Sequence, residues 1–190
     1  MTEGASLTRK MFVGIKVPPT LASMMASFWN TNLINDKYML WSDPDDLHIT
    51  LKFIGSVESS TVDRIEDGLG RLQFQTFKVI LDGAGTFKDV GVLFVKIEKS
   101  KELSSLQEAI DEAMLTNGIV QNDSRFTPHI SMAREESRAS NNAIAQHDLV
   151  SRLNEFLKTL PSLCFTVERF VLYETVSGHY QVTRQFDLGR

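Results

Sequence analysis

The sequence predicts an α+β fold, with antiparallel or mixed sheets rather than one parallel, doubly wound sheet. Strand-like segments are interleaved with segments whose apolar residues recur every three or four positions, as they do on one face of a helix. Two of the links between expected strands are short enough for hairpins, which join antiparallel neighbours. The expected order is β-α-β-α-β-β-α-β-α-β-β, over nearly the whole chain of 190 residues.

Most of the expected strands are bounded by turn residues. Pro18 and Pro19 end the first, and Gly55 ends the second. The glycine-rich linker 83–89 and the segment 176–178 are expected to be the turns of two hairpins. The strand segments are 11–17, 45–55, 77–81, 92–97, 126–133, 165–173 and 180–188.

Each expected helix carries a stripe of apolar residues, which we take as its buried face. Pro19 suits the first turn of the first helix, Ser100 can cap the third, and Pro161 stops the fourth. The stripes are Leu21, Met25 and Phe28; Val62, Ile65, Leu69 and Leu72; Leu103, Leu106, Ile110 and Met114; and Ile144, Leu149, Leu153, Phe156 and Leu157.

Composition places the chain among ordinary globular proteins, with 42% hydrophobic and 23% charged residues. No apolar run approaches the roughly 18 residues that cross a bilayer, so no membrane partner is expected. The single cysteine, Cys164, fits a reducing compartment, and we expect a cytoplasmic monomer, with a nuclear location left open. The net charge of −4 argues against broad attraction to duplex nucleic acid, but a local basic pocket for one phosphate remains compatible with it.

Two of the expected strands carry the same short motif, a histidine followed two residues later by a hydroxyl residue. His48 and Thr50 form the first, and His129 and Ser131 form the second, 129 − 48 = 81 residues further on. Side chains alternate along a strand, so His48, Thr50 and Lys52 are expected to share one face. The opposite face of that strand is apolar. We therefore expect the apolar face to lie in the core and the other face to carry the groups that do chemistry.

The duplicated motif resembles that of the two-histidine (2H) phosphoesterase superfamily. The flanking stretches 41–55 and 126–134 are most similar to RNA 2',3'-cyclic phosphodiesterases, also called 2'-5' RNA ligases or LigT-like proteins. This resemblance extends over about residues 11–188. It implies an N-terminal tail over 1–10 and one domain over 11–190, in which two pseudo-symmetric lobes, flanked by helices, surround a central cleft.

The resemblance also implies an activity, a metal-independent phosphodiesterase that opens RNA 2',3'-cyclic phosphate ends to 2'-phosphates, with 2'-5' RNA ligation as the reverse process. The expected partner is an RNA end or a small nucleotide, and no cofactor or metal is expected. By resemblance, His48 is the general acid and His129 the general base. An imidazole has an ordinary pKa of about 6.5, which suits both tasks. The residues alone do not distinguish the two roles.

Four other side chains complete the expected site. Thr50 and Ser131 are placed with the catalytic histidines, since their hydroxyls can reach phosphate oxygens. Lys52 and Arg134 are candidate substrate-binding residues, and Arg134 matches an arginine that commonly follows the second motif in LigT-like proteins. Strict alternation puts Arg134 opposite His129, so its role requires the strand to end or twist there.

Two alternatives remain open from the sequence. One is a 2'-5' oligoadenylate phosphodiesterase of the same superfamily. The other is a non-catalytic nucleotide-binding module, because Gly85-Thr86-Phe87 and the segment 92–97 resemble the phosphoesterase-like domain of A-kinase anchoring proteins. A zinc hydrolase is disfavoured because the adjacent Asp45 and Asp46 alternate sides, and no Gly-x-Ser-x-Gly motif indicates a serine hydrolase.

Overall fold

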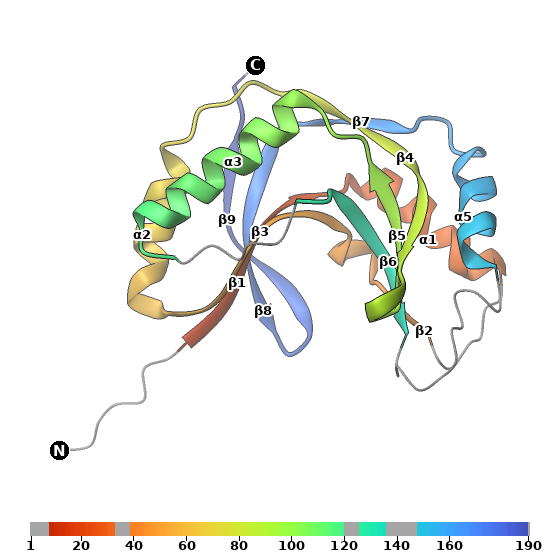
Figure 1. Ribbon diagram of the computed structural model, residues 1–190, viewed down its shortest axis with the longest axis horizontal. Helices are drawn as coiled ribbons and strands as arrows, with labels where there is room; N and C mark the ends of the chain where they lie inside the picture. Colours follow the sequence, from red (N-terminus) through yellow and green to blue (C-terminus); the bar gives the residue numbers. More distant parts are fainter. Residues whose placement is uncertain (1–7, 33–38, 120–125, 136–147, 190) are drawn as a thin grey trace.

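The computed structural model describes residues 8–32, 39–119, 126–135 and 148–189, and its architecture is α+β, as predicted (Figure 1). The helices are α1 (Pro19–Asn32), α2 (Ser59–Gly70), α3 (Lys101–Thr116) and α5 (Leu149–Leu157). The strands are β1 (Thr8–Lys16), β2 (Met39–Trp41), β3 (His48–Glu58), β4 (Phe77–Phe87), β5 (Val92–Ile97), β6 (His129–Glu135), β7 (Cys164–Val167), β8 (Arg169–Val176) and β9 (His179–Asp187).

These strands form one curled sheet in the order β7-β4-β5-β6-β3-β1-β8-β9, with β2 added beside β6. The paired strands are antiparallel throughout the described chain. At the middle of the sheet, β3 and β6 pair only at Ile49 and Ile130. The sheet is therefore two half-sheets joined at one narrow contact, which is the bilobal arrangement that was expected.

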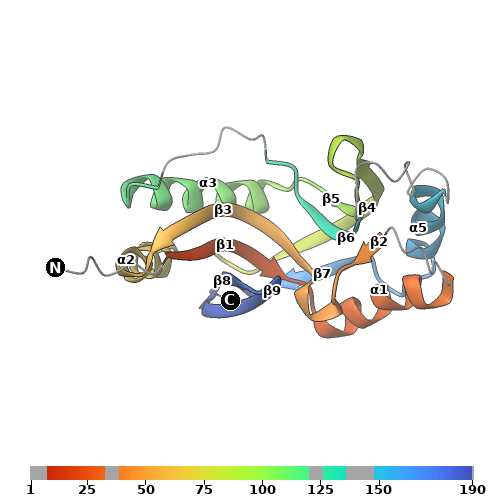
Figure 2. The same cartoon turned by 90° about the horizontal axis from the view of Figure 1, so that it is seen from below.

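The helices are shared between the two half-sheets in a pseudo-symmetric way. Helices α2 and α3 lie together over the half that contains β1, β3, β8 and β9, whereas α1 and α5 lie at the other half (Figures 1 and 2). Phe28 of α1 touches Phe156 of α5, with ring centroids 5.3 Å apart. Each half-sheet thus carries a pair of helices on its outer side, and the inner side stays open.

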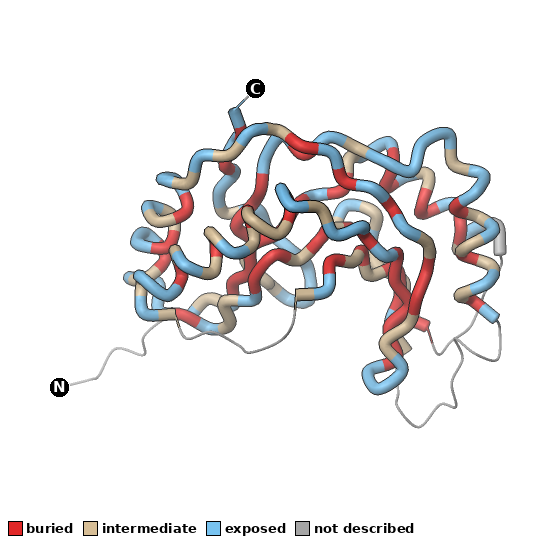
Figure 3. The backbone as a smooth tube through the Cα atoms, turned by 45° about the horizontal axis from the view of Figure 1, so that its top comes forward, coloured by how far each residue is buried: buried red, intermediate tan, exposed pale blue. Residues whose placement is uncertain are grey.

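The predicted apolar stripes form the core. The stripe residues of α2 and α3 that were expected to be buried are buried, apart from the half-buried Leu72, which lies just beyond α2. Ser100 caps α3 as predicted, its hydroxyl accepting from the amide of Leu103 at 3.1 Å. Ile144 lies outside the described residues. Buried segments concentrate in the central strands and exposed ones on the outer turns (Figure 3), and no described helix is long and apolar enough to cross a membrane.

Several predicted boundaries are wrong. β1 begins at Thr8, before the expected tail ends, and β3 continues past Gly55 to Glu58. The linker 83–89 is not a turn, because β4 runs through it to Phe87 and the turn follows at Gly91, whose φ is +60°. Gly85 lies against the ring of Phe94, where a Cβ would come within 2.8 Å of Cζ, so glycine there allows close pairing.

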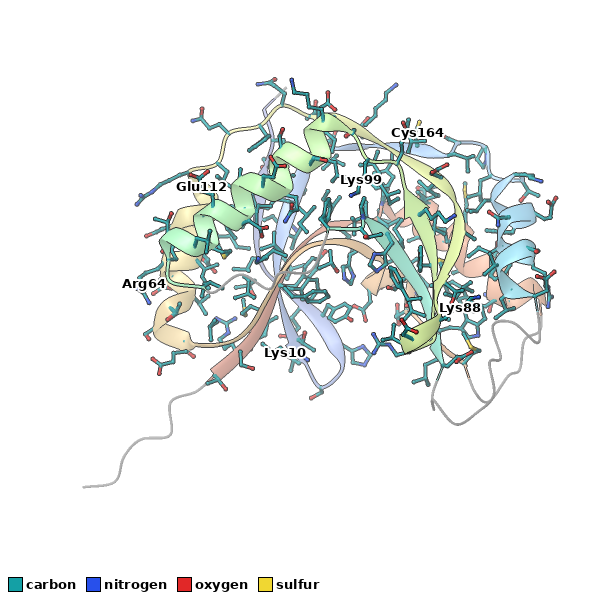
Figure 4. The ribbon with its side chains drawn as sticks, viewed as in Figure 1. Lys10, Arg64, Lys88, Lys99, Glu112 and Cys164 are labelled. Atoms are coloured by element: carbon teal, nitrogen blue, oxygen red, sulfur yellow. The ribbon has the colours of Figure 1, made fainter. Side chains whose placement is uncertain are left out.

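The C-terminal segment also differs from the prediction. The expected strand 165–173 is divided at residue 168 into β7, which pairs with β4, and β8, which pairs with β1. The hairpin turn at Ser177 and Gly178 is confirmed, with φ of +51° and +87°. Cys164 is exposed at the start of β7, the strand at one end of the sheet (Figure 4).

Candidate active site

His48 is fixed at the start of β3 by its own chain. Asp43 caps the 3₁₀ turn η1 (Pro44–Asp46) by accepting from the amide of Asp45 at 2.9 Å. The turn presents the carbonyl of Asp46 to His48 Nδ1 at 2.6 Å. A carbonyl only accepts, so the proton of the neutral ring is on Nδ1. Nε2 is then the atom that gains or loses a proton, and it lies 3.1 Å from Thr50 Oγ1.

His129 is held in the same way at the start of β6. Its Nδ1 lies 2.7 Å from the carbonyl oxygen of Thr127, two residues earlier. The same reasoning puts the proton of the neutral ring on Nδ1 and leaves Nε2 to exchange protons. Both rings are therefore fixed in the same tautomer, and each has one nitrogen available for acid or base chemistry.

The two histidines line one cavity of about 620 Å³ between the half-sheets. Thr50, Ser131 and Arg134 line it too, so five of the six predicted site residues lie together. Lys10 of β1 also lines the cavity, as does Val90 from the turn after β4. Figure 4 labels Lys10 and, in that turn, Lys88. The pairing of the half-sheets at Ile49 and Ile130 places both motifs beside this cavity.

Aromatic rings pack around each imidazole. Phe12 and Tyr180 lie against His48, with centroids 4.8 and 5.0 Å away. Phe87 and Phe94 lie against His129, at 5.0 and 5.3 Å. These rings limit the motion of both imidazoles and lower the local polarity.

Gly14 of β1 permits the close packing beside His48. A Cβ at Gly14 would lie 2.9 Å from the carbonyl oxygen of Ile49 and 3.4 Å from Cδ2 of His48. Glycine at this position thus lets β1 approach the first motif.

Burial lowers the pKa of both histidines, because a poorly hydrated site disfavours the imidazolium. At His48 the fall in pKa is opposed by the backbone hydrogen bond to Asp46 and by the charge of the Asp46 carboxylate. At His129 it is opposed by the hydrogen bond to Thr127. The two imidazoles also disfavour double protonation, since a charge on His129 lowers the pKa of His48.

The predicted position of Lys52 is wrong because β3 bulges after Thr50. Thr50 pairs with Gly14 but Lys52 pairs with Val13, so the intervening Leu51 is an extra residue. Val13 belongs to the core, and Lys52 is turned to that side of the sheet with only 7% of its surface exposed. Its Nζ lies 2.8 Å from Asp111 Oδ1 of α3. The lysine therefore leaves the face that carries His48.

A matching bulge in β6 brings Arg134 to the cavity. Ser131 pairs with Phe94 but Ala133 pairs with Leu93, so Met132 is the extra residue of the second motif. Arg134 then pairs with Val92 and returns to the face of His129 and Ser131. The role of Arg134 was expected to require an end or a twist of the strand, and the structure shows a bulge before this residue instead. Burial and the charge of Asp46 raise the pKa of Tyr180, and the charge of Arg134 opposes this rise.

Three other side chains at the cavity matter for the site, although none was among the predicted site residues. Asp46 and Tyr180 lie beside His48, and Phe53 is 63% exposed within the cleft. Phe53 was assigned to the apolar face, but the bulge turns it to the side of Phe12. Phe53 and Arg134 are each the fifth residue after a motif histidine. Because β3 and β6 run antiparallel from Ile49 and Ile130, these two residues point toward opposite ends of the cleft.

Metal ligands do not gather at this site or elsewhere in the described ranges, where no three His, Cys, Asp or Glu side chains come together. The groups that line the cavity include the two imidazoles, the hydroxyls of Thr50 and Ser131, the guanidinium of Arg134, the ammonium of Lys10 and the carboxylate of Asp46. These suit proton transfer beside an anion whose charge is matched by Arg134.

Two half-sheets that each bring a His-x-Thr/Ser strand to one cleft define the class of two-histidine phosphoesterases. The sequence matches the family model of the 2'-5' RNA ligase superfamily over residues 35–179, and the chain belongs to that superfamily. Within the class it is LigT-like.

Named relatives agree with this membership. The RNA 2',3'-cyclic phosphodiesterase of Archaeoglobus fulgidus is 33% identical over 95 residues, covering 48% of this chain and 53% of the relative. The chain thus spans about half the length of that relative. The RNA 2',3'-cyclic phosphodiesterase of Bacillus subtilis is 26% identical over 129 residues, covering 65% of this chain and 70% of the relative.

Solved structures show the same fold. E. coli LigT complexed with 3'-AMP superimposes with a TM-score of 0.77 at 20% identity, covering 97% of this chain and all (100%) of that one. TT0787 of Thermus thermophilus superimposes with a TM-score of 0.72 at 22% identity, covering 95% and 99% of the two chains.

Proposed function

We propose that the protein hydrolyses 2',3'-cyclic phosphates at RNA ends to 2'-phosphates. The observation that carries this proposal is the pair of histidines with Nδ1 held by a backbone carbonyl and Nε2 available in one shared cavity. The names of the relatives from Archaeoglobus fulgidus and Bacillus subtilis support the same substrate class. The E. coli LigT structures with 3'-AMP and ATP support nucleotide binding in a cleft of this fold.

In the proposed reaction His129 is the base and His48 the acid. Nε2 of His129 takes a proton from water as the water oxygen bonds to phosphorus. The bond between phosphorus and the 3'-oxygen breaks, and the proton on Nε2 of His48 passes to that oxygen. The product is a 2'-phosphate, and exchange of one proton from His129 to His48 through solvent restores the starting state.

The surroundings of His48 support this assignment. Burial lowers the pKa of both histidines, and at His48 the charge of the Asp46 carboxylate opposes this fall. Asp46 therefore favours the proton that the acid must hold before the reaction. The base must be neutral, and burial favours neutral imidazole at His129.

Three groups are proposed to bind the phosphate. Arg134 can pair with its non-bridging oxygens, and the hydroxyls of Thr50 and Ser131 can donate to them from the same face as the histidines. Charge-assisted hydrogen bonds of this kind strengthen as charge develops in the transition state. Lys52 is left out of the phosphate site because its ammonium is held by Asp111.

We also propose that the half-sheets act as a single domain, and that the protein works as a cytoplasmic monomer. One continuous core includes Met11 of β1 and Leu157 of α5, which come from opposite halves. The site takes its two histidines from one chain, so a second copy adds nothing that the proposed reaction requires.

Ligation follows from the same chemistry. If a 5'-hydroxyl of a second RNA replaces water, its oxygen bonds to phosphorus and the 3'-oxygen leaves as before. The product is a 2'-5' linkage, and the reverse reaction cleaves one. The same two histidines exchange the same two protons, so hydrolysis and ligation require no different residues.

The test of this proposal is turnover of an oligoribonucleotide that ends in a 2',3'-cyclic phosphate, measured in the presence of a chelator. We expect a 2'-phosphate product from the wild-type protein and a loss of at least about 100-fold in His48→Ala and in His129→Ala. Lys78→Ala is the control, because Lys78 is an exposed residue of β4 outside the cavity lining. Unchanged turnover in either folded cavity variant would contradict the mechanism.

A further inference from the structure

A second, smaller cavity opens beside the catalytic one. It has a volume of about 230 Å³ and lies where β3, the residues before β6 and helix α3 meet. The two cavities share four lining residues, namely Thr50, Phe53, Phe87 and His129. A group bound in the smaller cavity is therefore adjacent to the catalytic cleft. Pockets for drug-sized ligands are typically about 300–1,000 Å³, so this one suits a single ring system.

The wall of the smaller cavity is aromatic. Phe53, Phe87 and Phe126 all line it, and Phe53 keeps 63% of its surface exposed. Phe87 is held by stacking on Phe94, with centroids 4.2 Å apart and planes at 29°. Planar nucleobases stack on such rings whatever their sequence. Arg134 lines the larger cavity but not this one.

Polar groups on α3 complete the wall. Gln107 donates from Nε2 to Oδ2 of Asp111 at 2.7 Å. This bond sets the orientation of the amide, because a carboxylate only accepts, and it leaves Oε1 of Gln107 as the acceptor of that side chain. Lys52 holds the other carboxylate oxygen of Asp111, at 2.8 Å. Lys52 also lines this cavity, but its ammonium is held by Oδ1 of Asp111, and that oxygen is buried. The acceptors left to the cavity are therefore Oε1 of Gln107 and Oδ2 of Asp111.

We propose that this cavity, lined by Phe53, Phe87, Phe126, Gln107 and Asp111, binds the nucleobase next to the cyclic phosphate and prefers a base with an amino group. Guanine fits best, because its N1–H and its amino group are adjacent donors for two acceptors. Adenine and cytosine offer one amino group each, and uracil offers none. The inference rests on the proposed cyclic-phosphate chemistry for the position of the base, but binding tests it separately.

The first experiment compares kcat/KM for the 2',3'-cyclic phosphates of guanosine, adenosine, cytidine and uridine. We expect guanosine to be used best and uridine worst, by about tenfold or more for two hydrogen bonds. In Gln107→Met the guanosine-to-uridine ratio is expected to fall by about 2- to 10-fold, since one acceptor is removed. This substitution leaves the ion pair of Lys52 and Asp111 in place. Leu115→Ala, at an exposed position of the same helix, is the matched control.

The second experiment uses no turnover. Binding of guanosine 2'-phosphate and uridine 2'-phosphate is measured by calorimetry in the His48→Ala protein, with and without Phe53→Ala. Loss of the stacked ring is expected to weaken binding of both by about 5- to 150-fold. Phe126→Ala should act in the same direction if Phe53→Ala proves unstable.

The outcomes separate the two proposals. Equal kcat/KM for all four bases, with no effect of Phe53→Ala or Phe126→Ala on binding, overturns the base site and leaves the cyclic phosphodiesterase standing. Base-selective binding that depends on Phe53 and Gln107, without turnover of any cyclic phosphate, supports the base site and contradicts the proposed reaction.

Discussion

Replacing Lys52 by methionine tests whether this lysine stabilises the fold or binds phosphate. The side chain is 6% exposed, so methionine keeps most of its packing while removing its charge. Oδ1 of Asp111, a buried atom, loses the ammonium that lies 2.8 Å away. Removing one partner of a buried ion pair costs about 3–5 kcal/mol. Because the Asp111 side chain is 22% exposed, water can reach part of the carboxylate, and we expect the lower value, about 3 kcal/mol.

The assay is urea unfolding at pH 7, together with kcat for a cyclic-phosphate substrate under conditions where the protein is folded. A loss of about 3 kcal/mol is a large part of the 5–15 kcal/mol typical of a whole domain. The double variant Lys52→Met/Asp111→Asn should recover most of this loss, since it leaves no unpaired charge.

The reasoning predicts that kcat of Lys52→Met changes by less than about threefold. A phosphate ligand would behave differently, because a charge-assisted bond to the transition state contributes strongly to kcat. A stability loss below about 1 kcal/mol, combined with a fall in kcat of about 100-fold or more, would refute the structural role.

The remaining predictions concern the site. Burial lowers the pKa of both histidines, so the bell-shaped profile of kcat/KM should have its maximum below about pH 6.5, and a maximum above about pH 7.5 would contradict this. Because both pKa values are lower in the folded state, the folded protein binds fewer protons than the unfolded chain near pH 6.5, so its stability should fall as the pH drops through about 6.5. Thermal unfolding should show a smaller fall in a His48→Gln/His129→Gln protein. Arg134→Met should lower kcat/KM by about 10- to 100-fold with little change in melting temperature, whereas an unchanged kcat/KM would remove Arg134 from the phosphate site. Gly14→Ala should cost about 1–3 kcal/mol in urea unfolding and also lower turnover, because its Cβ would lie 2.9 Å from a backbone oxygen beside His48. Gly70→Ala, whose Cβ would meet nothing closer than 3.9 Å, should be neutral or stabilising, and equal effects of the two substitutions would refute the packing argument.

The helices could be predicted from the sequence because their apolar stripes are regular. Spacing of three and four placed Val62, Ile65 and Leu69 on the buried face of α2, and the structure confirms it. The two histidine strands could be predicted because each motif repeats a two-residue period. Their meeting in one cavity was implied by the resemblance, since periodicity contains no information about which strands pair.

The bulges account for what the sequence did not reveal. An extra residue at Leu51 and another at Met132 shift the alternation by one, which turns Lys52 away and brings Arg134 in. Nothing in the local pattern marks them, because the extra residues are themselves apolar and continue the core face. Two bulges at the same offset from the two histidines are visible only in the pairing register. The repeat of the motif could have suggested that Phe53 and Arg134 are equivalent positions, since both follow a histidine by five residues.

The same limit applies to the smaller cavity. Gln107 and Asp111 are one turn apart on α3, and their spacing alone indicates a helix surface pair. Only the packing of α3 against β3 brings them to the smaller cavity beside the catalytic one.

The assignment of His48 as the general acid and His129 as the general base is tested most directly by changing the leaving atom. A substrate whose 3'-oxygen is replaced by sulfur leaves with little need for a proton, so the general acid becomes dispensable. The account predicts that His48→Ala recovers most of its lost kcat/KM with this substrate, whereas His129→Ala stays inactive because water still needs a base. Preferential rescue of His129→Ala would reverse the two roles, and rescue of neither variant would contradict acid catalysis by this pair.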